Sequence, residues 1–249
     1  KTLSGLSWSV VSQIGRQGLT FVIGIILARL LSPEEFGLIA MVTVFTGFAT
    51  LFADFGLGAA IIQEKEVNNT QLSSIFWINV IAGITLTMVF ILASKQIGIF
   101  YNRELLVPIT KLVAFNFTIS SIGIVHRALF SKEIDFKSLA KIEIVSILAG
   151  GISAVTLALL NFGVWSLVYQ SLITSAVSTI GVWLFNSWRP SFAYNFQEVR
   201  KLLSFSINML GERTINYWVR NTDNLLIGKV LGSSSLGLYS KAYNLMLFP

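Results

Sequence analysis

Long apolar stretches separated by short polar breaks run through the whole sequence. A helix needs roughly 20 apolar residues to cross the hydrocarbon core of a bilayer, and most stretches have this length. In lipid, a helix satisfies its own backbone hydrogen bonds, so the pattern predicts an all-α, polytopic membrane helix bundle. The predicted spans are 4–31, 36–62, 70–94, 105–129, 139–160, 164–186 and 199–231, with an eighth starting near 236.

Three of the breaks carry local structural signals. Ser32, Pro33 and Glu35 supply an N-cap, a proline at the first helical position and the acid that completes a capping box. Residues 161–163 (Asn-Phe-Gly) predict a tight turn between two helices. The longest break, 131–141, is charged, and we expect it to form an amphipathic loop at the membrane interface.

The first apolar stretch contains a polar stripe. Gln13, Arg16, Gln17 and Thr20 fall on one face of a helix. An arginine near the middle of a span costs at least roughly 2.5–3.5 kcal/mol on insertion scales, so it usually faces a bundle interior or a wet cavity. Arg16, Gln13 and Gln17 are therefore candidate substrate-binding residues. The alternative is a structural ion pair between Arg16 and a buried acid such as Asp54.

A second polar stripe occurs near the end of the sequence. Glu212, Arg213, Asn216, Arg220 and Asp223 recur at intervals of three and four residues. Arg213, Asn216 and Arg220 are candidate substrate-binding residues for an anionic ligand. The alternative is that Glu212 and Asp223 pair with the arginines on neighbouring turns of the same helix.

Two acids within the predicted spans are candidates for ion coupling. Asp54 and Asp223 are each suited to bind a proton or Na⁺ that drives transport. For Asp54, pairing with Arg16 or Arg127 is the favoured alternative. The only histidine, His126, falls at a predicted interface, where we expect a solvated side chain without a functional role. We predict no other cofactor, no catalytic residue and no metal site.

Composition agrees with a membrane protein. The chain is 54% hydrophobic and 12% charged, about half the charge of a typical soluble domain. Its net charge of +6 does not indicate nucleic-acid binding, because the basic residues lie at the ends of spans. Their bias predicts a cytoplasmic N-terminus. The cytoplasmic side collects, among others, Lys1, Lys132, Lys137 and Lys141.

The sequence contains an internal repeat. Residues 27–31 (LARLL) and 36–38 (FGL) are echoed by 227–231 (IGKVL) and 236–238 (LGL), each set following a polar stripe. An even number of predicted spans separates the copies, so both enter the membrane in the same direction. We expect parallel repeats, as in some transporters. Gly15, Gly18 and Gly24 are expected to permit close packing or bending of the first helix.

Four motifs carry a resemblance to a known family. They are LARLLSPEEFGL at 27–38, LFADFGLG at 51–58, RNTDNLLIGK at 220–229 and GLYS at 237–240. With them the chain resembles the oligosaccharide flippases of polysaccharide biosynthesis, in the superfamily that also holds the multidrug exporters and the lipid II flippase.

The resemblance implies two six-helix lobes around a central cavity, lined largely by the first and seventh helices. Residues 1–188 would form the first lobe and 189–249 the beginning of the second, in a fragment that does not transport by itself. The implied activity is movement of undecaprenyl-pyrophosphate-linked oligosaccharide across the bacterial cytoplasmic membrane. The implied partners are this lipid-linked oligosaccharide, membrane lipids and a polysaccharide polymerase.

Two other functions are alternatives to a flippase. An ion-coupled multidrug exporter would share the fold, but exporters of organic cations need buried acids, and here the stripes carry Arg16, Arg213 and Arg220. A membrane enzyme of polysaccharide assembly would need a catalytic carboxylate pair or a large loop to hold the sugar. The sequence contains no Asp-x-Asp and no long outer loop.

Overall fold

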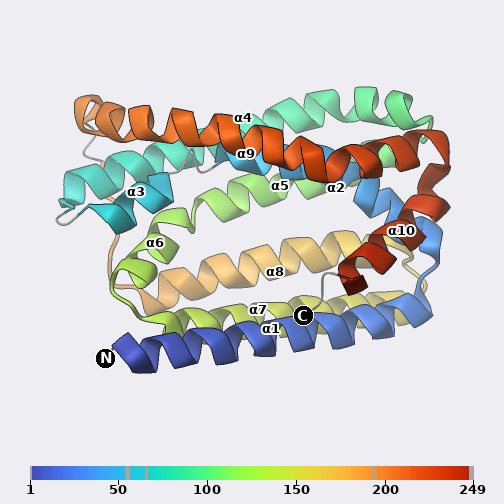
Figure 1. Cartoon of the computed structure of the whole chain (residues 1–249), viewed down its shortest axis with the longest axis horizontal. Coiled ribbons are helices and arrows are strands. Elements are labelled where there is room, and N and C mark those ends of the chain that lie inside the picture. The colour runs from blue at the N-terminus through green and yellow to red at the C-terminus, as the bar shows by residue number, and fades with distance from the viewer. Residues whose placement is uncertain (1, 54–56, 65–66, 193–194, 247–249) are drawn as a thin grey trace.

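The computed structural model describes residues 2–53, 57–64, 67–192 and 195–246. Side chains are described in these ranges except at 2–12, 57, 59–60, 196–210 and 244–245. All the regular elements in the described ranges are helices, which confirms the predicted all-α fold (Figure 1). They are α1 (Thr2–Leu30), α2 (Pro33–Ala53), α3 (Leu57–Gln63), α4 (Asn69–Tyr101), α5 (Leu106–Ser121), α6 (Ile124–Lys132), α7 (Phe136–Leu159), α8 (Val164–Phe185), α9 (Phe196–Val230) and α10 (Gly232–Met246).

Most of the long helices run roughly along the long axis of the molecule, whereas α6 and α10 are inclined to it (Figure 1). Short turns join α4 to α5 and α7 to α8, and each pair packs as a hairpin. α1 lies along α7 at the bottom of Figure 1, and α9 runs along α2 near the top. The turn between α7 and α8 uses Asn161 and Gly163 at positive φ, as its sequence predicted.

Several helices have the length and hydropathy of membrane spans. Among the described residues these are α2, α4, α7 and α8, and the bent pair of α5 and α6 makes a fifth if it is counted as one span. α1 and α9, the helices that bear the polar stripes, are long but are not in this set. Large apolar side chains on the spans point outward, as contact with lipid requires. Examples are Ile81, Met88, Leu92, Ile152 and Leu184.

The predicted span 105–129 is broken near its end. α5 and α6 meet at an angle of 44° around Ile122 and Gly123. The bend releases backbone carbonyls, and side chains of α8 satisfy them. Trp183 Nε1 donates to the Ile122 carbonyl at 3.0 Å, and Thr179 Oγ1 donates to the Ile119 carbonyl at 2.9 Å. The break is therefore compensated inside the bundle.

The charged break at 131–141 is shorter than predicted, and the expectation of an amphipathic loop there is wrong. α6 continues to Lys132, and α7 already begins at Phe136. Asp135 makes this possible because its side chain accepts from the Ser138 backbone N–H at 3.1 Å and so caps α7. Charged residues that looked like a loop thus form the first turns of a helix.

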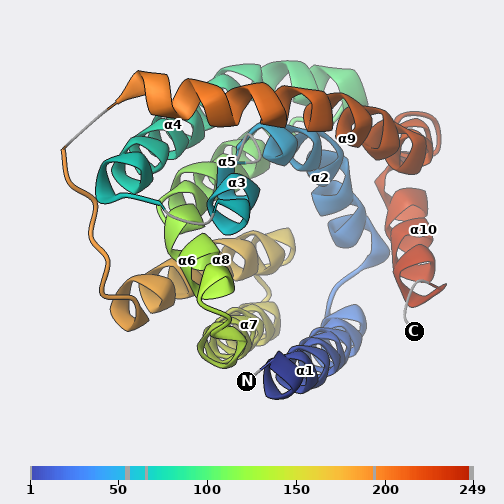
Figure 2. The same ribbon diagram turned by 60° about the vertical axis from the view of Figure 1, so that its left-hand side comes forward.

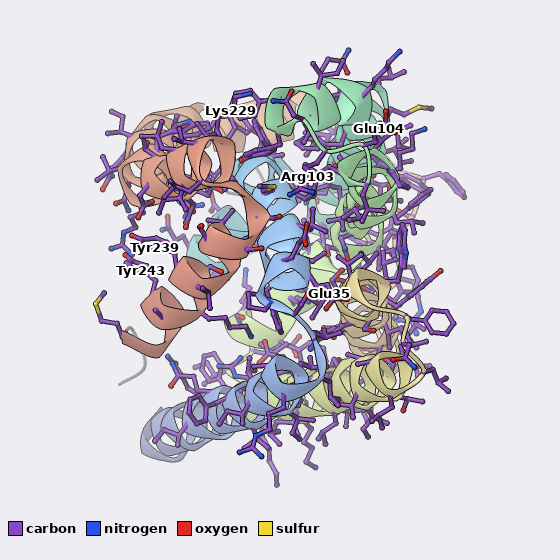
Figure 3. The ribbon with its side chains drawn as sticks, turned by 90° about the vertical axis from the view of Figure 1, so that its right-hand side faces the viewer. Glu35, Arg103, Glu104, Lys229, Tyr239 and Tyr243 are labelled. Carbon is purple, nitrogen blue, oxygen red and sulfur yellow. The ribbon has the colours of Figure 1, made fainter. Side chains whose placement is uncertain are left out.

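The start of α2 carries the predicted capping box. The Ser32 backbone N–H donates to Glu35 Oε2 at 2.6 Å, and the Glu35 backbone N–H donates to Ser32 Oγ at 3.4 Å. Glu34 beside them pairs with Arg103 from the turn after α4, with Arg103 Nη1 at 3.2 Å from Glu34 Oε1. These contacts fix the beginning of α2 against α4 (Figure 3).

The two copies of the repeat meet where α10 crosses the beginning of α2. A methyl group on Gly37 would overlap the Ser233 carbonyl oxygen, and one on Gly237 would overlap the Pro33 carbonyl oxygen. Gly37 and Gly237 occupy equivalent positions of the repeat, as do Pro33 and Ser233. The crossing is thus symmetric in sequence, because each copy's glycine packs on the first turn of the other copy's helix. Figures 2 and 3 show α10 next to the beginning of α2.

Candidate functional site

Arg16 forms an ion pair with an acid from a distant helix. α1 lies along α7, and Arg16 Nη1 donates to Glu143 Oε2. The Arg16 and Glu143 side chains remain 31% and 29% exposed, so the pair is only partly buried. The arginine is therefore held in place by a carboxylate and is still accessible to another anion.

Glu143 was not singled out by the sequence analysis. The available signal was an acidic residue about one turn into the mostly apolar predicted span 139–160. An acid in such a position generally faces a partner charge rather than lipid. The predicted ion-pair alternative for Arg16 is thus realised with Glu143, whereas Asp54 lies outside the described residues.

A second arginine lies close to this pair. Arg127, on α6, interacts electrostatically with Glu143, and its Nη2 donates to Ser178 Oγ on α8 at 2.9 Å. Four helices, α1, α6, α7 and α8, thereby contribute polar groups to one cluster. We name Arg16, Arg127, Glu143 and Ser178 the first-helix cluster.

The other residues of the first polar stripe lie on the same face of α1. Gln13 is exposed, and Gln17 is half-buried. Gly15 and Gly18, on the same helix, have open space where a Cβ would be added, and Gly24 has only Lys241 Nζ at 3.9 Å. These glycines therefore make no close helix contact in the described part of the chain, whereas the expectation that they permit bending stays a prediction.

The second polar stripe lies on α9, and its candidate substrate-binding side chains are exposed. Arg213, Asn216 and Arg220 are exposed. The ion pairs formed within the described part of the chain are Arg16–Glu143 and Arg103–Glu34, so neither arginine of the stripe pairs there with Glu212 or Asp223. The predicted local pairs are absent from this part, which leaves Arg213 and Arg220 as uncompensated cations along one helix.

Asp223 is held by a tyrosine rather than by an arginine. Tyr239 Oη, on α10, donates to Asp223 Oδ2, while the Asn224 backbone N–H donates to Asp223 Oδ1 at 2.8 Å. Tyr239 stacks on Tyr243 one turn further along α10 (Figure 3). The candidate ion-coupling acid is thus tied to the contact between α9 and α10.

His126 is buried, so the expectation of a solvated histidine is wrong. Its side chain is 0% exposed, and its ring centroid lies 4.5 Å from that of Trp183 and 5.2 Å from that of Trp188. The bend before α6 explains the difference because it turns this residue inward beneath the two indoles. His126 packs in an aromatic cluster apart from both polar stripes.

Comparison with known proteins confirms the family resemblance. Residues 26–249 match the family described as "Polysaccharide biosynthesis protein". The lipopolysaccharide biosynthesis protein WzxC of Escherichia coli (strain K12) is 31% identical over 255 residues, covering 100% of this chain and 51% of the relative. The teichuronic acid biosynthesis protein TuaB of Bacillus subtilis (strain 168) is 30% identical over 249 residues, covering 99% of this chain and 52% of the relative.

A third relative carries the word transport in its name. The succinoglycan biosynthesis transport protein ExoT of Rhizobium meliloti (strain 1021) is 28% identical over 244 residues, covering 98% of this chain and 49% of the relative. No solved structure matches the chain. The chain spans about half the length of the curated relatives it matches. Its family match and its apolar helices together show that the chain belongs to the polysaccharide biosynthesis protein family and is part of a multi-pass membrane protein.

Proposed function

We propose that the full-length protein is a flippase that moves a lipid-linked oligosaccharide across the bacterial cytoplasmic membrane. The observation that carries the proposal is Arg16, an accessible cation in the middle of the long helix α1, in a chain of this family. A pyrophosphate head group must cross a region of low dielectric constant, and a guanidinium binds phosphate oxygens bidentately. The relative named as a transport protein supports a transporter rather than an enzyme.

The substrate's parts make different demands on the protein. The undecaprenyl-pyrophosphate group binds first to the cations of α1 and α9, entering from the cytoplasmic side. The glycan occupies a hydrated cavity, where Gln13, Gln17 and Asn216 donate hydrogen bonds to its hydroxyls. The polyprenyl tail stays in lipid throughout, so only the polar head crosses the low-dielectric region.

The lobes rock to open the cavity on the other side. Residues 1–188 form the first lobe, and 189–249 begin the second as a parallel repeat. The symmetric crossing of α2 and α10 supports this division, because equivalent glycines of the two copies make equivalent contacts. The N-terminus lies in the cytoplasm, and the transported unit passes to a polysaccharide polymerase. A proton or Na⁺ gradient acting at Asp54 or Asp223 drives the cycle.

The exposed arginines of α9 provide a prediction. Arg220→Glu is expected to lower substrate affinity at least tenfold, because it replaces an uncompensated cation facing the phosphate path by an anion. Binding of the lipid-linked oligosaccharide to the purified full-length protein measures this. Lys111→Glu on α5, an exposed cation outside both stripes, is the matched control. Unchanged affinity in Arg220→Glu excludes this arginine from the path.

Proteoliposomes test the function itself. We expect the full-length protein to move a polyprenyl-pyrophosphate oligosaccharide to the opposite leaflet and to leave organic cations where they are. Export of cations without movement of the lipid would make it a multidrug exporter. Transfer of sugar from a soluble donor would instead make it an enzyme of polysaccharide assembly.

A further inference from the structure

Two arginines of the first-helix cluster feel the charge of one carboxylate, and one of them is paired with it. Arg16 approaches Glu143 from α1 and donates to it directly. Arg127 interacts with the same carboxylate from α6 and is oriented by its hydrogen bond to Ser178 on α8. Among the described residues, Arg16 pairs with Glu143 alone, and Arg127 forms no ion pair. The cluster therefore holds more positive than negative charge.

The carboxylate stabilises the cluster while no ligand is bound. An unpaired guanidinium among apolar helices loses its hydration without compensation. Glu143 supplies the compensation for Arg16 at the position where an external anion would bind. About 30% of each of these two side chains is accessible, so an anion from outside reaches the pair without unfolding the helices around it.

We propose that Glu143 is an internal competitor for a phosphate group at Arg16 and Arg127. The bound phosphate displaces the carboxylate from Arg16 and is also contacted by Arg127, and the carboxylate returns to Arg16 when the phosphate leaves. A pyrophosphate fits this site because its two phosphoryl groups offer acceptors to both guanidinium groups. The inference rests on the proposed function in that it assigns the site to the pyrophosphate of a lipid-linked saccharide, but the shared chemistry is that of any pyrophosphate.

A competitor lowers apparent affinity and speeds release. The apparent dissociation constant is the intrinsic one divided by the fraction of molecules whose arginines are free. Removing the competitor therefore tightens binding and slows the departure of the transported lipid. An ion pair that only holds α1 against α7 behaves differently, because its loss disturbs Arg16 and cannot improve binding.

The test measures binding to the full-length protein in detergent, for wild type and Glu143→Gln. The two ligands are inorganic pyrophosphate and a polyprenyl-pyrophosphate oligosaccharide. We expect the dissociation constant of the lipid-linked ligand to fall about fivefold or more in Glu143→Gln, the usual range for coupled sites. Glu34→Gln is the matched control, because it removes a carboxylate from another arginine pair, Arg103–Glu34, and leaves affinity unchanged.

The outcomes separate the source of the ligand from the existence of the site. If the dissociation constants of both ligands fall in Glu143→Gln, the site recognises the pyrophosphate group alone. If only that of the lipid-linked ligand falls, the rest of the lipid is also needed for binding. A dissociation constant that stays the same or rises in Glu143→Gln for both ligands overturns the proposal. If Glu143→Gln binds the ligands more tightly but the wild-type protein moves no lipid, the role of Glu143 as a competitor is supported and the proposed flippase function is refuted.

If Glu143→Gln does not fold, a second variant and a kinetic measurement still test the proposal. Glu143→Asp keeps the charge but shortens its reach, so we expect an affinity between those of wild type and Glu143→Gln. In the transport assay, loss of the competitor lowers both KM and the maximal rate. A lower maximal rate with an unchanged KM would show a merely structural ion pair.

Discussion

Replacing Arg16 by alanine is expected to abolish transport of the lipid-linked oligosaccharide while the full-length protein still folds. Truncating one member of a shielded charge pair that binds a ligand costs about 2–5 kcal/mol, and each 1.4 kcal/mol is about tenfold in affinity. The expected loss is therefore roughly thirtyfold to several thousandfold. We expect folding to survive because the Glu143 side chain is 29% exposed and keeps part of its hydration, and because Arg127 still interacts with it electrostatically.

The measurement is the initial rate of lipid movement in proteoliposomes, with size-exclusion chromatography as the check on folding. Arg16→Lys keeps the charge but loses the bidentate geometry, so an intermediate rate is expected. Gly18→Ala is the control on the same helix, since an added methyl meets nothing within 4 Å. Full transport by Arg16→Ala would remove this residue from the mechanism.

The glycines at the crossing of α2 and α10 are expected to be the most sensitive positions for stability. Gly37→Ala places a methyl group on the Ser233 carbonyl oxygen, and Gly237→Ala places one on the Pro33 carbonyl oxygen. Both neighbours are backbone atoms and cannot rotate away. Alanine stabilises a helix by about 1 kcal/mol relative to glycine, but overpacking of this kind costs about 3 kcal/mol. We therefore expect both substitutions to destabilise the protein.

Thermal unfolding of the full-length protein measures this effect. We expect Gly37→Ala and Gly237→Ala each to lower Tm, and by similar amounts, because the two contacts are equivalent in the repeat. Gly18→Ala should leave Tm unchanged or raise it, since it gains helix propensity without a clash. Equal Tm values for all three variants would show that α2 and α10 do not pack in this way.

Local signals in the sequence predicted local structure well. The capping box of Ser32 and Glu35 and the turn at 161–163 depend on residues only a few positions apart, so their chemistry can be read directly. The helices α2, α4, α7 and α8 follow from their apolar length, whereas α1 and α9 are long without the hydropathy of these four. The loop predicted for 131–141 failed because Asp135 begins a helix there, and a charged first turn looks like a charged loop.

Long-range partners could not be predicted. The sequence marked Arg16 as unusual, but nothing in one sequence says that Glu143, rather than another acid, lies beside it. The burial of His126 depends on a bend and on two tryptophans far along the chain. Close packing was expected at the glycines of α1, whereas glycines of other helices make the close contacts, among them Gly37 and Gly237 in the repeat motif.

In the proposed mechanism, cations on α1 and α9 recognise the charged head group during transport. The most direct measurement compares two lipids with the same glycan and polyprenyl tail in proteoliposomes containing the wild-type full-length protein. One lipid carries the pyrophosphate and the other an uncharged linkage. We predict rapid movement of the first and none of the second. Equal movement of both lipids would contradict the account, because the arginines would then have no part in recognising the substrate.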